Sequence, residues 1–497
     1  MRLLAGSRRG SVAVMTAMMA LPLIGLSGIA VDAGRMWLVQ SRLQAAVDAG
    51  VLAAARQMGS PAAQQDGIAL FWANFLPSNV SSGAAYMGAT ASDPVVTSPS
   101  ASTIVMTSTA TLPTTLTSVL GFTTLTVSVS AAALSQATGL EVALVLDNTG
   151  SMEGSPIQSV VNASSTLVNT LYGSGSQDVQ PNLWVAVVPF TAEVNMGKTH
   201  TSWLAPNSYT ASAWSSAGWK GCVMARTATG DDSTETPPIG TGGVPFTPFL
   251  WPSTVGVYKV GKKILTGDNE WSANNINEQN QNGYSDGLVW GPNLGCPTLA
   301  VLPETASRST VLNTLSQMVA VHRGGTFINL GLQAGWWTLS PLWRGLWGSS
   351  ALPLNYNTQY IRKVIVLMTD GNNLWNDYSG AAPGVGPSPW TNDGDTDYSA
   401  YGRLLQNQMK IATLNQSNAT AEINNRMSQM CTNIKQKGIT IYTILFNHDG
   451  GISTDTQNLF SACASDPSNY YFAPSDATLQ AAFSQIGSQL ANLRLTQ

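Results

Sequence analysis

Charged residues are scarce in this chain of 497 residues. Lys, Arg, Asp and Glu together make up 10% of the sequence, and the formal net charge is −4. A nucleic-acid-binding surface is strongly basic, so this composition argues against a nucleic-acid partner. Ser, Thr, Asn, Gln and Gly supply the polarity instead, a balance that suits a secreted or envelope protein. The hydrophobic fraction of 44% supports a sizeable core, and the length allows two or three domains.

The known catalytic sequence signatures are also missing. The sequence contains no His-Glu-x-x-His zinc motif, no Gly-x-Ser-x-Gly elbow, no phosphate-binding Gly-x-x-x-x-Gly-Lys-Ser/Thr loop and no dinucleotide fingerprint. A hydrolase that activates water with a bound cation would need a general base. The nearest candidate, Glu153, equally suits the first turn of a helix. We therefore predict that the protein is not an enzyme.

Only four cysteines occur: Cys222, Cys296, Cys431 and Cys463. An even number in an exported chain predicts disulfides, because the bacterial periplasm is oxidising. Of the three possible pairings we favour Cys222 with Cys296, which share one polar segment, and Cys431 with Cys463, which flank a predicted strand. A zinc site is not expected, since no Cys-x-x-Cys pair or nearby histidine is present.

The N-terminal residues 1–31 combine a basic tip with a long apolar run. Three arginines lie within the first nine residues, and no charged residue occurs from Gly10 to Val31. Such a run is long enough to cross a bilayer as a helix, and the arginines favour a cytoplasmic N-terminus. We predict a single transmembrane anchor, with the bulk of the chain periplasmic or extracellular. The alternative is a signal peptide cleaved near Gly28-Ile-Ala30.

Two further segments precede the second half of the chain. Residues 32–58 lack proline and repeat apolar residues at helical spacing, which predicts an extended helix. Residues 59–138 are rich in Ser, Thr, Ala and Val. Within them, 103–110 and 123–130 alternate hydroxylated and apolar side chains, as half-buried strands do. This pattern predicts a small β-rich unit, with a disordered Ser/Thr linker as the alternative.

Three stretches of this N-terminal region carry a family resemblance. They are Arg9-Gly-Ser-Val-Ala-Val, Val31-Asp-Ala-Gly-Arg35 and Leu43-Gln-Ala-Ala-Val-Asp48-Ala-Gly-Val-Leu-Ala-Ala. The region resembles the N-terminus of TadE/TadG-like proteins of tight-adherence (Flp-type) pilus systems. The resemblance implies anchoring in the inner membrane near a pilus-assembly machine. A prepilin carries Glu five residues after its cleavage glycine, but Met15 stands there after Gly10, so processing into a pilin subunit is not predicted.

A hydrophobic strand that ends in oxygen-bearing side chains opens the second half. Val142–Leu146 is short, apolar and β-branched, which is typical of a buried parallel strand. Asp147, Thr149 and Ser151 follow at alternate positions and place three oxygen ligands on one loop. Mg²⁺ favours such ligands in near-octahedral geometry and keeps several waters. The alternative is that Asp147 and Ser151 only cap the next helix.

Two later segments supply further oxygen ligands. Thr326 follows two glycines at the start of an apolar helix, and Val364–Asp370 is another buried strand that ends in an acid. Ligands of doubly wound sheets bind outside the carboxyl ends of the strands, so these loops are expected to converge. The three segments resemble, in order, the metal-ion-dependent adhesion site of von Willebrand factor A domains. In that family Ser is more frequent where this chain has Thr149. The resemblance implies a divalent-cation site, for Mg²⁺ or else Mn²⁺ or Ca²⁺, formed by Asp147, Thr149, Ser151, Thr326 and Asp370.

The expected fold of residues 139–497 is therefore α/β, with a doubly wound, mostly parallel sheet. Hydrophobic patterning predicts its other elements: helices over 157–172, 311–321, 328–339 and 401–437, a final helix through Leu479 and Leu493, and strands over 183–190, 439–446 and 469–472.

Two polar insertions interrupt this pattern, at about 191–308 and 372–400. The first contains six tryptophans, which we interpret as its own small core rather than a ligand-binding face. The second contains Asn392-Asp-Gly-Asp-Thr-Asp397, which we interpret as an exposed acidic turn because its spacing does not fit an EF-hand.

Two functions are compatible with these features. The first is a membrane-anchored module that binds a protein through its metal, in pilus assembly or adhesion at the bacterial envelope. An acidic side chain of a pilus-assembly component or a surface target would complete the metal coordination. The alternative is a non-catalytic envelope scaffold that assembles through its N-terminal helix, with a structural or vestigial metal site.

Overall fold

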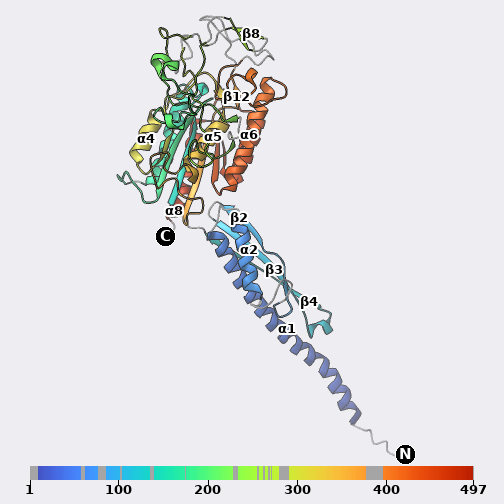
Figure 1. The fold of residues 1–497 in the computed structure, drawn as a ribbon. Coiled ribbons are helices and arrows are strands. Elements are labelled where there is room, and N and C mark those ends of the chain that lie inside the picture. The colour runs from blue at the N-terminus through green and yellow to red at the C-terminus, as the bar shows by residue number, and fades with distance from the viewer. Residues whose placement is uncertain are drawn as a thin grey trace, which may run out of the picture. The chain divides into compact units, whose positions relative to one another are not determined.

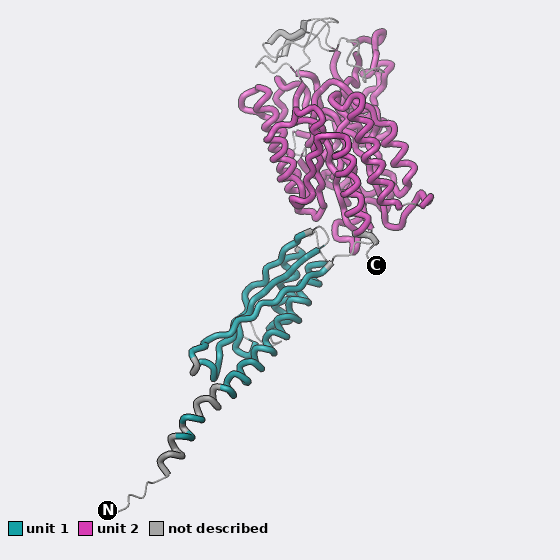
Figure 2. Tube along the Cα trace, turned by 180° about the vertical axis from the view of Figure 1, so that it is seen from behind, with its two compact units in different colours: residues 1–135 teal, residues 136–497 magenta. Residues whose placement is uncertain are grey.

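The chain forms two compact units, residues 1–135 and 136–497, which are coloured separately in Figure 2. Each unit is described by itself. The computed structural model describes the following residues: 9–56, 62–76, 86–100, 103–134, 139–173, 175–227, 233–253, 257–260, 263–266, 269, 271–278, 290–376 and 396–495.

Unit 1 consists of two helices packed on an antiparallel sheet. The helices are α1 (Arg9–Arg56) and α2 (Ala62–Phe75), and the strands are β1 (Thr90–Ala91), β2 (Val95–Ser100), β3 (Thr103–Pro113) and β4 (Thr124–Leu134). Strand β3 pairs with each of the other three, and its residues alternate between buried and half-buried. The predicted strands are thus present. Helix α2 was not predicted, because residues 59–138 were interpreted as β-rich throughout.

Helix α1 runs without interruption through the predicted anchor and the predicted extended helix. The helix packs closely on the rest of unit 1 at Gly28, where an added Cβ would lie 2.6 Å from the Leu116 Cβ. Gly28 lies within the predicted anchor. Among the described residues, no helix has both the length and the apolar character that crossing a membrane requires. The anchor over residues 10–31 stays a prediction.

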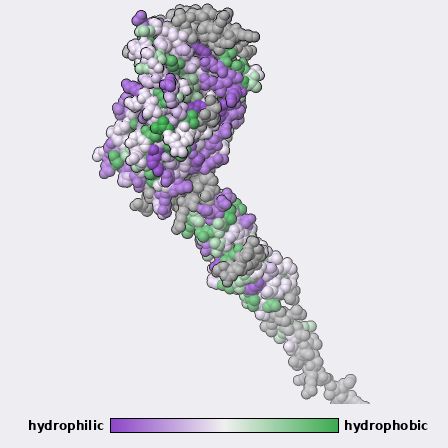
Figure 3. Space-filling view, viewed as in Figure 1, coloured by the Kyte–Doolittle hydropathy of each residue, from purple (hydrophilic) through white to green (hydrophobic). Residues whose placement is uncertain are grey.

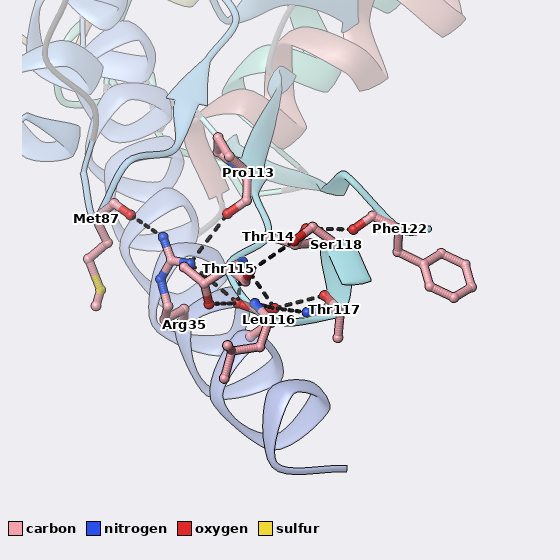
Figure 4. Close-up of polar contacts among 10 residues, drawn as sticks. Arg35, Met87, Pro113, Thr114, Thr115, Leu116, Thr117, Ser118 and Phe122 are labelled. Carbon is pink, nitrogen blue, oxygen red and sulfur yellow. Dashed lines mark hydrogen bonds and ion pairs between the residues drawn. The ribbon is translucent and has the colours of Figure 1, made fainter. Parts of the chain in front are cut away.

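The Asp32 carboxylate of α1 binds the loop between β3 and β4. Figure 4 shows this loop, with Thr115 and Thr117, beside Arg35 of the same helix. The Asp32 carboxylate accepts hydrogen bonds from the backbone N–H groups of Thr115, Leu116 and Thr117 at 3.0 to 3.1 Å. The Thr115 and Thr117 hydroxyls donate to it at 2.6 and 2.7 Å. Arg35 adds a contact at 3.3 Å and donates to the Met87 carbonyl at 2.8 Å. A loop between β3 and β4 is thereby fixed to the helix.

Unit 2 is a six-stranded sheet covered by helices on both faces (Figure 1). The strand order is β14-β13-β11-β5-β6-β9, and all neighbours are parallel except the edge strand β9. Its strands are β5 (Gly139–Asp147), β6 (Leu183–Phe190), β9 (Leu302–Thr305), β11 (Ile361–Thr369), β13 (Thr440–Phe446) and β14 (Tyr470–Ala473). Two small antiparallel pairs lie outside it: β7 (Val257–Val260) with β8 (Lys263–Thr266), and β10 (Gly325–Thr326) with β12 (Leu374–Trp375). The doubly wound, mostly parallel sheet is therefore confirmed.

Alternate residues of the central strands feed two separate cores. Leu144 and Leu146 of β5 pack on one face, together with α3 (Ser155–Tyr172), α4 (Arg308–Ser316) and α8 (Asp476–Leu495). Ala143 and Val145 pack on the other face, together with α5 (Ile328–Leu339), α6 (Gln416–Gln436) and α7 (Thr454–Cys463). Every residue of β5 is buried, as the uninterrupted apolar run predicts for a strand covered on both sides.

Two of the predicted helices are shorter than expected. Residues 401–437 were expected to be helical throughout, but α6 begins only at Gln416, after Asn415, whose side chain accepts the Asn418 N–H. The preceding segment turns at Asn407 and Lys410, which both have positive φ. Helix α4 ends at Ser316, whereas the prediction extended it to residue 321. Apolar spacing alone did not reveal these ends.

The tryptophans of the first insertion are buried, but not in one core of their own. Trp203, Trp214 and Trp219 pack in the core between the sheet and helices α5 and α6, which corrects the interpretation of a separate core. Trp251 lies in a small separate cluster with Phe249 and the Cys222–Cys296 disulfide. Disulfides join Cys222 to Cys296 and Cys431 to Cys463, the two pairings favoured from the sequence. By restricting the unfolded chain, each contributes about 4 kcal/mol to the free energy of unfolding in the chain-entropy account.

The second insertion corrects one interpretation. Asp397 was expected in an exposed acidic turn, yet its side chain is fully buried and forms an ion pair with Arg323 at 2.7 Å. The residues Asn392 to Asp395 of that turn lie outside the described part of the chain. The pattern of closely spaced acids did not show that one of them has a distant arginine partner.

We expect Asp32→Asn to lower the melting temperature of unit 1 at pH 7. The hydrogen bonds from Thr115 and Thr117 hold the pKa of the Asp32 carboxyl well below its usual range. A lowered folded-state pKa stabilises the protein above the unfolded value of about 4, and this stabilisation is lost as pH falls. The difference between wild type and Asp32→Asn should therefore shrink in acid, as measured by thermal unfolding at several pH values. Asp48→Asn, at an exposed position of α1, is the control. Equal melting at pH 7 would contradict the prediction.

Candidate functional site

The first predicted ligand loop leaves the carboxyl end of β5 in the sheet centre. Asp147 is the last residue of the strand and is fully buried, and its Oδ1 accepts the Thr149 N–H at 2.8 Å. This bond turns the chain so that the hydroxyls of Thr149 and Ser151 lie 3.1 Å apart. One short turn thus presents a carboxylate and two hydroxyl oxygens.

The third loop meets the first directly, because β11 is paired with β5. The ladder ends with Met368 opposite Leu146, and the next residue, Thr369, donates its hydroxyl proton to Asp147 Oδ2. Asp370 follows and accepts a hydrogen bond from the Ser151 hydroxyl at 2.8 Å. Residues 219 positions apart are therefore in contact, as convergence at the carboxyl edge predicted.

The second loop is attached beside the first. Val321 donates its N–H to the Asn148 carbonyl at 2.8 Å and bridges to Thr149. Gly325 pairs with Trp375 across the short β10–β12 ladder. Its φ is +115°, and an added Cβ would lie 2.1 Å from the Leu374 carbonyl oxygen, so only glycine fits. Thr326 follows and is buried, but none of its side-chain hydrogen bonds connects it with the other four predicted ligands among the described residues.

Asp397 anchors this second loop from the other insertion. Its carboxylate accepts two hydrogen bonds from the Arg323 guanidinium, at 2.7 and 2.9 Å, and a third from the Gly324 N–H at 3.0 Å. The Arg323 guanidinium carbon also lies 5.0 Å from the centre of the Trp251 ring. Both insertions therefore contribute to holding the residues that precede Thr326.

Burial of two neighbouring carboxyls dominates the electrostatics of the site. Burial, and secondly the charge of Asp370, raises the pKa of Asp147 to about 7. Burial also raises the pKa of Asp370, although hydrogen bonds from Ser151 and His448 oppose that change. Two carboxylates held close together in a low-dielectric environment repel each other. A proton or a cation relieves this repulsion.

Three residues of the site were not predicted. Thr369 donates to Asp147, His448 Nε2 lies 3.1 Å from Asp370 Oδ2, and His322 Nε2 lies 3.2 Å from Glu153 Oε2. Thr369 directly precedes the predicted ligand Asp370, a signal that was available in the sequence. The two histidines lie on loops after Val321 and Phe446, and no local pattern marks them.

The oxygen donors of Asp147, Thr149, Ser151 and Asp370 fit a hard divalent cation. Carboxylates and hydroxyls are the ligand types that Mg²⁺ and Mn²⁺ accept, and water fills the remaining positions. No group of three or more His, Cys, Asp or Glu side chains suited to a metal occurs in the described residues. A set of two carboxylates and several hydroxyls is not a group of that kind, because hydroxyl side chains are not among those four residue types.

Fold and site together define the class: a doubly wound α/β domain with a candidate cation site at the carboxyl edge of its sheet. The N-terminal segment gives the more particular assignment. Residues 10–57 match the family described as putative Flp pilus-assembly TadE/G-like, which confirms the resemblance of that segment. No curated protein matches the sequence.

Several solved structures are similar to this chain. The von Willebrand factor domain of the type V pilus tip protein Mfa5 of Porphyromonas gingivalis is 12% identical, with 73% of this chain and 97% of that chain covered and a TM-score of 0.34. The pilus adhesin SpaC of Lactobacillus rhamnosus GG is 11% identical, with 80% and 34% covered and a TM-score of 0.32. The mussel byssus protein PTMP1 with a zinc-occupied adhesion site is 12% identical, with 72% and 48% covered and a TM-score of 0.31. These sequence identities and TM-scores are too low to support an argument about function from the solved structures. The proposed cation-dependent binding therefore depends on this chain's own residues.

We expect the full chain to bind Mg²⁺ or Mn²⁺ in calorimetry, and Asp147→Ala and Asp370→Ala to abolish binding. The cation displaces the proton that Asp147 retains near pH 7, so affinity should be about ten-fold weaker at pH 6 than at pH 8. Asp455→Ala, at an exposed position on α7, should bind like wild type. Absence of binding by folded wild type at pH 8 would disprove the metal site.

Proposed function

We propose that this protein is an envelope-tethered binding module of the Flp pilus-assembly type, which captures an acidic side chain of a protein partner through a divalent cation. The observation that carries the proposal is the contact between the first and third loops. Ser151 and Asp370 join across the sheet, and Asp147 lies beside them. A ligand carboxylate would add negative charge to a site that already holds two acids, so capture requires the cation.

Hydroxyl ligands give this site its selectivity for an acidic group. Thr149, Ser151 and Thr326 are neutral. The hydrogen bonds that the Asp147 and Asp370 carboxylates accept disperse part of the negative charge of these two acids. A cation held in this way keeps a net positive charge, which attracts a carboxylate of the protein partner. Hydrophilic residues cover much of the face of unit 2 seen in Figure 3, as expected for a surface that binds through polar contacts.

The tether is assigned to the N-terminal part of α1. The family match of residues 10–57 supports an envelope location. Met15, Met18, Met19 and Leu26 expose roughly two thirds of their surface. Exposed apolar side chains at this density favour a lipid or another helix over water.

We expect matched peptides to show whether the protein captures an acidic side chain. Immobilised peptides that differ only in Asp against Asn at one position should be compared for retention of the full chain. Wild type should be retained by the Asp peptides in Mg²⁺ and released by EDTA, and Asp370→Ala should not be retained. Equal retention by the Asn peptides, or retention that survives EDTA, would contradict cation-mediated capture.

Tethering is tested by flotation of the full chain with phospholipid vesicles. Replacing Met18 and Met19 by Asp should abolish flotation, because charged side chains are costly to bury in lipid. Met87→Asp, at another exposed methionine of unit 1, is the matched control and should float like wild type. A wild-type chain that does not float would instead favour the scaffold function, in which the exposed face of α1 packs on similar helices.

A further inference from the structure

An ion pair is buried at the end of the central sheet that lies away from the metal loops. Glu141 of β5 and Lys363 of β11 are register partners in the parallel ladder. Glu141 is 0% exposed and Lys363 is 4% exposed. The Lys363 Nζ contacts Glu141 Oε2 and donates to the Leu339 carbonyl at 2.9 Å. Lysine and glutamate are held in contact in the interior.

The two oxygens of the Glu141 carboxylate have different surroundings. Oε1 accepts the Leu354 N–H at 2.7 Å, whereas Oε2 meets the Lys363 amine. The Lys363 amine is thus held beside the Glu141 carboxyl group, while a backbone donor is bound to the other oxygen. The donor stabilises the charge that develops on Oε1, as an oxyanion hole does.

A third ionisable group lies beside this pair with no evident structural role. Glu304, on the edge strand β9, is buried, and neither of its carboxyl oxygens has a hydrogen-bond partner in the part of the chain that the structure describes. Burial, and secondly the charge of Glu141, raises the pKa of Glu304 well above its usual range. It interacts electrostatically with both Glu141 and Lys363. An unpaired buried acid costs stability and is retained here next to an amine and a carboxyl.

We propose that Lys363 and Glu141 condense to an intramolecular amide bond between β5 and β11, and that Glu304 transfers the protons. The Lys363 ammonium first gives one proton to Glu141, which leaves a neutral amine and a neutral carboxyl. The Nζ attacks the carboxyl carbon, the bond from carbon to Oε2 breaks, and Oε2 leaves as water with a proton relayed by Glu304. Glu304 recovers its proton from the nitrogen. One bond to nitrogen forms, one water is released, and no oxidant or reductant takes part.

Such a bond would connect the two strands that carry the acidic residues of the metal site. Asp147 is the last residue of β5, and Asp370 directly follows β11. The two strands would then remain joined under reducing conditions, in a chelator or under a pulling force. This inference does not depend on the proposed function, because it concerns residues away from the metal loops.

Mass spectrometry of the full chain tests the bond directly. Proteolysis of denatured wild type should yield one branched peptide that contains Glu141 and Lys363 and lacks the mass of one water. The Lys363 amine should resist acylation after denaturation. The ion pair of Lys437 with Glu235, at 2.7 Å, is an internal control, because the half-exposed Lys437 should remain free and be acylated. Separate, unmodified Glu141 and Lys363 peptides in wild type would overturn the proposal.

Variants test the role of Glu304. Glu304→Gln keeps the size of the side chain but removes its acid, and it should slow bond formation about 100-fold or more. Lys363→Arg should never yield the branched peptide. Complete bond formation in Glu304→Gln would overturn the assignment of Glu304. If either variant fails to fold, the wild-type peptide masses still decide whether the bond exists.

Discussion

The parallel register between β5 and β11 is the constraint on which the functional part of this protein depends. It sets Met368 opposite Leu146, and the residues that follow bring Asp370 to Ser151 at 2.8 Å. Backbone hydrogen bonds of a sheet fix such pairings to the residue, since a shift by one position would turn every side chain to the opposite face. The candidate cation site is therefore positioned by the central strands of the sheet rather than by loops alone.

The site concentrates negative charge where solvent cannot screen it, and this determines its chemistry. Asp147 and Asp370 raise each other's energy when both are ionised, and hydroxyl donors compensate only part of that cost. Either a proton or a bound cation would relieve this repulsion, so cation binding at this site would depend on pH. In unit 1 the opposite holds for Asp32, because its carboxylate is surrounded by N–H and hydroxyl donors and is stable as an anion.

The two insertions support the loop that leads to Thr326. Asp397 holds Arg323 and Gly324, and the ring of Trp251 lies against the same arginine. Trp251 of the first insertion and Asp397 of the second thus both support the loop that leads to Thr326. The Arg323–Asp397 ion pair is largely buried, with side-chain exposures of 10% and 0%.

The sequence by itself determined most of the strands and helices of unit 2 and the two loops that follow β5 and β11. Apolar runs and helical spacing are local properties, and they located β6 and α5 to the residue. Tertiary structure alone decided the existence of α2, the turn before α6, the partner of Asp397, and the positions of His448 and Glu304. These features depend on contacts between residues far apart in the chain, and such contacts follow from strand order and register. A local pattern carries no information about them.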